Sequence, residues 1–154
     1  MCIRDSFFTG FSRLSSEIQT STERKMEDKI PQLLEILHLV DKAEEILTNN
    51  QIPLSEFGQL LDDTWQLKRK ITDKISNDVI DNLYDKAIKA GALGGKLLGA
   101  GGGGFLLFYV ESNKQAAVKK ALENLLYVPF SFENQGARII YYTTDITKEM
   151  VKQI

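Results

Sequence analysis

The chain has 154 residues, of which 43% are hydrophobic and 26% charged, and its 19 basic and 21 acidic side chains give a net charge of -2. This composition is typical of a globular domain with one core and excludes an intrinsically disordered chain. The absence of a basic excess excludes a nucleic-acid-binding protein of the usual kind. One cysteine and one histidine exclude an internal disulfide and a His/Cys zinc cluster.

No stretch of the sequence predicts a membrane anchor. The longest purely apolar run, residues 105–110, is far too short to span a bilayer. The N-terminal residues lack the apolar core of a signal peptide. We therefore expect a cytoplasmic protein with no membrane and no nucleic-acid partner.

The first six residues, Met-Cys-Ile-Arg-Asp-Ser, are similar to a leader that occurs on truncated reading frames from assembled sequence data. We expect residues 1–6 to be such a leader, residues 7–145 to form the domain and residues 146–154 to be a tail. Residues 7–11 are aromatic and β-favouring, which predicts a short strand.

Three amphipathic helices are predicted within residues 15–90, because apolar residues recur there at three- and four-residue steps. The first ends at Asn49, the second begins after Pro53, and the third is capped by Ser76 and ended by Gly91. The apolar positions are Ile30, Leu33, Leu34, Leu37, Val40, Ala43 and Leu47 in the first helix, Phe57, Leu60, Leu61, Thr64, Leu67 and Ile71 in the second, and Ile80, Leu83, Tyr84, Ala87 and Ile88 in the third.

After these helices the pattern changes to strands around one further helix. Ser112 and Gln115 have the spacing of a capping box that opens this helix. Pro129 lies inside one predicted strand and favours an edge position for it. The strands are predicted at residues 96–98, 105–110, 128–132 and 137–143. The β-β-α-β-β order predicts an α+β fold, a ferredoxin-like antiparallel sheet packed with the preceding helical bundle.

A glycine run separates two of these strands and consists of Gly99, Ala100, Gly101, Gly102, Gly103 and Gly104. It matches G-x-G-x-x-G formally, but a dinucleotide-binding turn is followed by a helix, and a Walker loop ends in Lys-Ser or Lys-Thr. Two interpretations remain: a tight hairpin without a ligand, and a turn whose bare amides form an anion-binding nest. A hairpin needs only two or three glycines, so the surplus favours close approach of a ligand or of another loop.

The stretch Lys96–Phe105 resembles the third conserved motif of the GHMP kinase superfamily, which is named for galactokinase, homoserine kinase, mevalonate kinase and phosphomevalonate kinase. Residues 7–13, 65–69 and 89–98 are similar to the branch that phosphorylates heptose 7-phosphate. The resemblance implies the C-terminal half of an ATP-dependent sugar kinase. In that family a separate N-terminal half supplies the phosphate loop, the Mg²⁺ ligands and, in many members, a catalytic aspartate, so we expect ATP and Mg²⁺ to be bound mainly outside this chain.

The resemblance also implies which residues form the site. The backbone of Gly99–Gly104 is expected to lie against the transferring phosphate, and no catalytic or metal-binding residue is expected here. A sugar phosphate needs cations, and the candidates are Arg13, Lys68 and Arg69. For the two helical residues a solvated helix face is an equal alternative. Lys96 is expected to pair with a carboxylate, and Trp65 to lie in the core or at a domain interface.

Two functional hypotheses follow. In the first, the chain is an enzyme fragment that is inactive alone, needs its N-terminal kinase domain, and exposes apolar surface around Phe7, Phe8 and the glycine run. In the second, it is a stand-alone ferredoxin-like module that binds a small ligand by itself.

Overall fold

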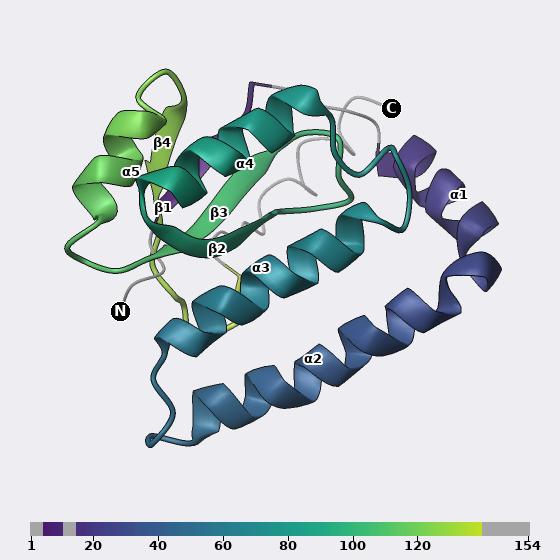
Figure 1. Ribbon diagram of the computed structural model, residues 1–154, viewed down its shortest axis with the longest axis horizontal. Coiled ribbons are helices and arrows are strands. Elements are labelled where there is room, and N and C mark those ends of the chain that lie inside the picture. The colour runs from purple at the N-terminus through teal and green to yellow at the C-terminus, as the bar shows by residue number, and fades with distance from the viewer. Residues whose placement is uncertain (1–4, 11–14, 140–154) are drawn as a thin grey trace, which may run out of the picture.

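The computed structural model describes residues 5–10 and 15–139, which form a four-stranded antiparallel sheet with helices on one face and along one edge (Figure 1). The order of the strands across the sheet is β2-β3-β1-β4. The elements are β1 (Asp5–Phe8), α1 (Ser15–Lys25), a 3-10 turn (Glu27–Lys29), α2 (Ile30–Thr48), α3 (Ser55–Arg69), α4 (Asp78–Ala90), β2 (Ala92–Leu97), β3 (Phe105–Val110), α5 (Gln115–Ala121) and β4 (Leu126–Pro129). The predicted α+β class with an antiparallel sheet is confirmed.

The N-terminal strand lies in the centre of the sheet, between β3 and β4. It was predicted at residues 7–11 without a place in the sheet, but it runs from Asp5 to Phe8. Ser6 is buried, and its hydroxyl donates a hydrogen bond to the carbonyl of Val128 at 2.7 Å. A leader at residues 1–6 stays a prediction, although its last two residues pair in β1. The predicted tail lies outside the described residues.

Among the described strands, β4 lies at one edge of the sheet, as predicted from Pro129. Pro129 is the last residue of β4 and pairs with Asp5 of β1. The predicted extension to residue 132 is wrong, because the paired residues end there. Of the last predicted strand, residues 137–139 are not in a strand, and residues 140–143 lie outside the described part.

Two predicted helix caps are wrong. The side chain of Asn77, and not that of Ser76, caps α4 by accepting hydrogen bonds from two amides of the first turn, at 3.1 and 3.0 Å. Residues 112–114 form a turn instead of a capping box, because the Lys114 amide donates to the carbonyl of Glu111, and α5 begins at residue 115 without a side-chain cap. The predicted end of α4 is confirmed, since Gly91 has a φ of 112°.

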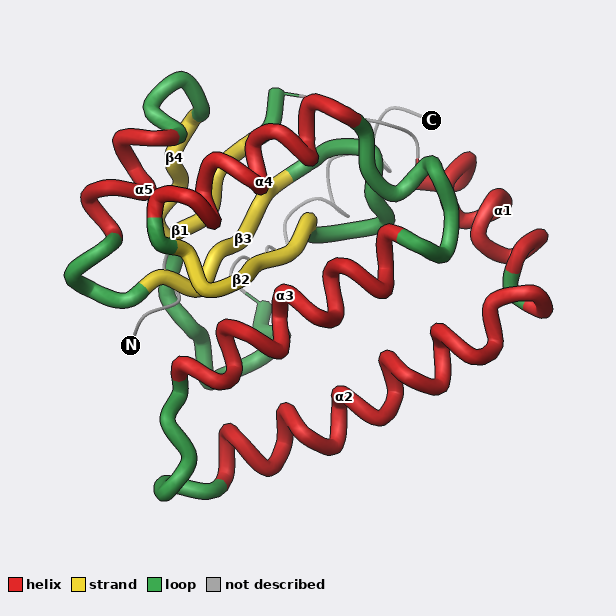
Figure 2. The backbone as a smooth tube through the Cα atoms, in the orientation of Figure 1, coloured by secondary structure: helices red, strands yellow, loops and turns green. Residues whose placement is uncertain are grey.

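The helices α2 and α3 run antiparallel beside each other, with α2 outermost (Figure 2). Leu39, Ile46 and Leu60 form a small core between them. The predicted apolar face of α2 is only partly buried, because the helix packs through Leu39 and Ile46 instead. Its outward side exposes Ile30, Leu34, Leu37, Val40 and Leu47. No described helix is long and apolar enough to cross a membrane.

The main core lies between the sheet and the helices α3, α4 and α5. Its largest fully buried side chains are Trp65, Tyr84, Phe7 and Phe108, so the core position predicted for Trp65 is confirmed. The rings of three of these residues pack in sequence at tilted angles, with centroids 5.9 Å apart between Trp65 and Tyr84 and 5.5 Å between Tyr84 and Phe108. This core fixes the end of α3 relative to β2 and β3, and thereby the loop that joins the two strands.

Candidate phosphate-binding loop

The glycine loop, residues 99–104, joins β2 to β3 and lies against the connection between α3 and α4 (Figure 2). The Gly102 amide donates to the Ile75 carbonyl at 2.8 Å. A Cβ on Gly101 would lie 2.8 Å from Ile75 Cα, so only glycine fits there. At the base of the loop the Leu98 amide donates to the Phe105 carbonyl, also at 2.8 Å. The loop is therefore docked on the protein and does not project freely.

Thr9, directly after β1, holds the far end of the loop. Its amide and its hydroxyl both donate to the Gly104 carbonyl at 2.9 Å, and the Gly104 amide donates back to the hydroxyl at 3.1 Å. The side chain of Thr9 is buried. One side chain therefore satisfies both backbone groups of the glycine at which the loop joins β3.

Lys68, on the last turn of α3, holds the near end. Its ammonium group donates to the Gly99 carbonyl at 3.1 Å. Burial lowers the pKa of Lys68, and the positive charge of Lys96 lowers it further. Lys96 forms no ion pair within the described residues, contrary to the expected carboxylate pairing. Neither of these two cations forms an ion pair with any residue that the structure describes.

Four amides of the loop have no hydrogen-bond acceptor in the part of the chain that the structure describes: those of Gly99, Ala100, Gly101 and Gly103. Gly99, Gly101, Gly102 and Gly104 have φ angles of 87°, 124°, 72° and 112°. This left-handed region is open to glycine at little steric cost. Unpaired amides beside a cation are the donors that anion sites in proteins use.

A cavity of about 700 Å³ adjoins the start of the loop. It is lined by α1, by Lys68 on the last turn of α3, by Ile71 and Ile75 in the connection to α4, and by Gly99 and Ala100. The loop therefore borders a space large enough for a small molecule.

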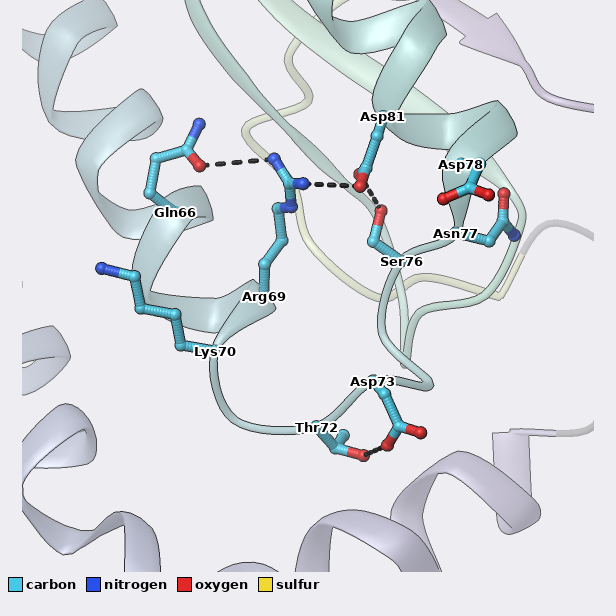
Figure 3. Close-up of a pocket in the computed structure, with 9 residues that line it drawn as sticks. All are labelled: Gln66, Arg69, Lys70, Thr72, Asp73, Ser76, Asn77, Asp78 and Asp81. Atoms are coloured by element: carbon cyan, nitrogen blue, oxygen red, sulfur yellow. Dashed lines mark hydrogen bonds and ion pairs between the residues drawn. The ribbon is translucent and has the colours of Figure 1, made fainter.

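The structure separates Arg69 from the loop. Successive helical residues point about 100° apart, so Arg69 lines a second cavity of about 540 Å³ on the other side of α3 (Figure 3). Its guanidinium binds the carboxylate of Asp81 and the side-chain oxygen of Gln66, and Ser76 donates to the same carboxylate. Of the three predicted cations, Lys68 reaches the loop, Arg69 is paired elsewhere, and Arg13 lies outside the described residues.

An apolar surface beside the loop stays a prediction, and it is wrong for Phe7, which is buried in the core. The rings of Phe8 and Phe105 lie 5.2 Å apart, and Phe105 and Leu98 are 37% and 38% exposed. Sequence reasoning missed Thr9 and the Ile75 carbonyl. The Thr-Gly pair that follows a β-favouring run was the available signal for Thr9, whereas a main-chain carbonyl gives none.

The donor set fits a phosphate and not a metal ion. Residues 5–10 and 15–139 contain no group of three His, Cys, Asp or Glu side chains close enough to hold a metal ion. The loop offers amide donors and one ammonium group, which suit phosphate oxygens.

Residues 43–128 match the family model described as "GHMP kinases C terminal". The chain belongs to the GHMP kinases, as a C-terminal domain of that family. The D-glycero-alpha-D-manno-heptose 7-phosphate kinase of Campylobacter jejuni is 33% identical over 137 residues, which are 86% of this chain and 40% of that protein. The mevalonate kinase of Pyrococcus abyssi is 30% identical over 123 residues, which are 75% of this chain and 36% of that protein.

The fold agrees with this membership. The solved structure of L. major mevalonate kinase in complex with R-mevalonate superimposes with a TM-score of 0.67 and 25% identity, over 79% of this chain and 38% of that one. The chain thus spans about two fifths of the length of these relatives. Sugar and mevalonate kinases are its homologues.

Proposed function

We propose that this GHMP domain is the C-terminal half of an ATP-dependent sugar kinase that acts on a heptose 7-phosphate-like acceptor together with an N-terminal nucleotide-binding half. The observation that carries the proposal is the docked glycine loop, in which four amides have no acceptor among the described residues and Lys68 contacts the first residue, Gly99. The 33% identity to the Campylobacter heptose 7-phosphate kinase supports a sugar phosphate as acceptor.

The loop contributes to phosphoryl transfer by holding phosphate oxygens in place. Such transfer is catalysed mainly by positioning and by charge neutralisation. ATP supplies the γ-phosphoryl group. The amides of Gly99, Ala100, Gly101 and Gly103 donate to its oxygens, and because the loop is anchored before binding, they need little reorganisation. The glycines keep side chains away, so the phosphate approaches the main chain closely.

The ammonium group of Lys68 provides the positive charge at the start of the loop, where the 700 Å³ cavity offers room for the acceptor. Arg13 is kept as a candidate for the acceptor's phosphate. Arg69 would have to exchange Asp81 for the substrate in order to bind it, so its proposed contribution is secondary. The catalytic base and the Mg²⁺ ligands are proposed to lie in the N-terminal half; for the Mg²⁺ ligands this agrees with the described residues, which hold no group of three His, Cys, Asp or Glu side chains that could bind a metal ion.

A chimera tests the proposal. The matched C-terminal region of the Campylobacter kinase is replaced by residues 5–154 of this chain, so that β1 is kept whole, and ATP-dependent phosphorylation of heptose 7-phosphate and of mevalonate is measured. We expect the sugar phosphate to be phosphorylated, mevalonate not to be, and the 154-residue chain alone to show no turnover.

The matched control is the same chimera with Gly101→Ala, which places a Cβ against Ile75 and disturbs the loop. If a folded chimera with this substitution kept its turnover, the result would argue against a role of the glycine loop in phosphoryl transfer. A chimera that folds but phosphorylates neither compound would contradict the proposed function. Tight ligand binding by the chain alone, without turnover in the chimera, would favour the stand-alone binding module.

A further inference from the structure

We infer that Thr9 is a positioning residue for the glycine loop: its hydroxyl fixes the peptide planes on both sides of Gly104 and so holds the neighbouring Gly103 amide toward a bound phosphate. The inference rests on the proposed function of the loop. It assigns a role to a side chain that carries no charge.

The hydrogen bonds at Gly104 differ from those of an ordinary sheet. In a hydrogen-bonded pair of an antiparallel sheet, the two opposed residues exchange both amide-to-carbonyl bonds. The Thr9 amide does donate to the Gly104 carbonyl, but the Gly104 amide donates to the Thr9 hydroxyl and not to a backbone carbonyl. The hydroxyl donates to the Gly104 carbonyl in turn. A side chain thus replaces one ladder bond at the point where the loop leaves the sheet.

The anchored peptide groups alternate along the loop. The peptide before Leu98 is held by Phe105, the one after Gly99 by Lys68, the one before Gly102 by Ile75, and the one before Gly104 by Thr9. The peptides between them carry the free amides of residues 99, 101 and 103. Each of these three amides is therefore flanked on both sides by a fixed peptide plane, whereas the free amide of Ala100 belongs to the peptide that Lys68 holds.

Thr9 is the anchor whose side chain can be changed with the least disturbance. Ile75 acts through its backbone, and Lys68 also carries a charge that acts on a phosphate. Thr9 is 4% exposed and uncharged, so replacing its hydroxyl alters the loop without altering the electrostatics. Valine has the same shape without the hydroxyl, and serine keeps the hydroxyl without the methyl group.

The experiment measures pyrophosphate binding to the full chain by amide NMR, for the native protein and for Thr9→Val, Thr9→Ser and Thr64→Val. Thr64 is the matched control, because its hydroxyl donates only to the Leu60 carbonyl in its own helix, at 2.7 Å. We expect Thr9→Val to weaken binding about tenfold, which corresponds to the loss of one well-placed hydrogen bond. Thr9→Ser and Thr64→Val should bind within about twofold of the native protein.

Each other outcome overturns the inference. Native affinity in Thr9→Val shows that the hydroxyl is dispensable, and equal losses in Thr9→Val and Thr9→Ser show that packing matters instead. In both cases the proposed function survives, because the native loop still binds. If the loop amides of the native protein do not respond to pyrophosphate, both the inference about Thr9 and the proposed function are wrong.

Hydrogen exchange in the native chain tests the inference even if Thr9→Val does not fold. We expect the Gly104 amide to exchange at least about tenfold more slowly than the amides of Gly99 and Gly103. Equal exchange at Gly103 and Gly104 would show that the hydroxyl does not hold the loop end.

Discussion

Glycine serves two different purposes in this domain, at the α3–β2 crossing and in the glycine loop. At the crossing, a Cβ on Gly94 would overlap the Gly58 carbonyl and lie 2.7 Å from the Asp62 amide. In the loop, a Cβ on Gly99 would meet nothing within 4 Å, yet the residue has a positive φ and an unpaired amide. The crossing needs glycine for space, whereas Gly99 in the loop needs it for backbone conformation, and Gly101 needs it for both.

This difference indicates that the crossing serves the stability of the domain and that the glycine loop serves ligand binding. At the crossing the Asp62 carboxylate and the Gly95 amide both have a partner: Tyr84 donates to the Asp62 carboxylate at 2.7 Å and accepts from the Gly95 amide at 3.1 Å. In the loop, four amides have no acceptor among the described residues. Unpaired donors are unfavourable unless something binds them. Substitutions at the crossing should therefore unfold the domain, and substitutions in the open part of the loop should weaken binding.

The largest effect is expected for Gly94→Ala. The added methyl group collides with the backbone of α3, which cannot move without breaking the main core, so the free energy of unfolding should fall by about 3 kcal/mol or more. Urea denaturation measures this. The matched control is Gly99→Ala, where only the positive φ is unfavourable and the loss should be about 1 kcal/mol. Equal losses would remove the distinction between the two regions.

Gly101→Ala tests the boundary between the two regions, because Gly101 combines a φ of 124° with close contact to Ile75. We expect a loss of about 2 kcal/mol in stability, from strain and overpacking together. Pyrophosphate binding should also weaken. A stable variant with native affinity would show that the loop is not docked on Ile75 in solution.

Tyr84→Phe tests the crossing without changing its shape. The buried Gly95 amide loses its acceptor and Asp62 loses a donor, so unfolding should become easier by about 1.5 kcal/mol. Burial, followed by the hydrogen bond to Asp62, raises the pKa of Tyr84, so this hydroxyl should stay protonated when exposed tyrosines ionise. Ultraviolet titration of the native chain measures the ionisation of its tyrosines. If every tyrosine ionised at the ordinary pH, the raised pKa of Tyr84 would be contradicted.

The smallest effect is expected for Lys96→Gln, which removes one of the two causes that lower the pKa of Lys68. The pKa of Lys68 should rise toward its ordinary value, as measured by NMR titration of its ammonium group. Because the folded pKa lies below the unfolded one, the unfolded state binds more protons between the two values, and the free energy of unfolding rises with pH through that window. Lys96→Gln should narrow the pH range between the folded and the unfolded pKa of Lys68. An unchanged titration of the Lys68 ammonium group would show that Lys96 does not act on it.

Local signals in the sequence predicted the local features of the fold. The continuous apolar run at residues 105–110 predicted β3, Gly91 the end of α4, and Pro129 an edge strand. The place of β1 could not be predicted, because its partners lie about 100 residues away in the sequence. The choice between Ser76 and Asn77 as cap failed because both residue types cap helices well, and only the turn before α4 decides between them.

The sequence predicted the loop of the candidate site, but it did not predict which neighbouring side chains contact that loop. The glycine surplus indicated a loop that something approaches closely, and the structure docks it on Ile75. Lys68 and Arg69 were equivalent in the sequence, but their helical phase sends one to Gly99 and the other to Asp81. Thr9 was missed because its importance depends on the strand pairing that brings it to Gly104.

The most direct test of the account is an amide NMR titration of the native chain with pyrophosphate. We predict that the amide resonances of Gly99, Ala100, Gly101 and Gly103 shift together and saturate, while those of the packed glycines Gly58, Gly94 and Gly95 stay in place. Shifts confined to surface lysines, or loop amides that do not move at any pyrophosphate concentration, would contradict the claim that this loop is built to bind phosphate.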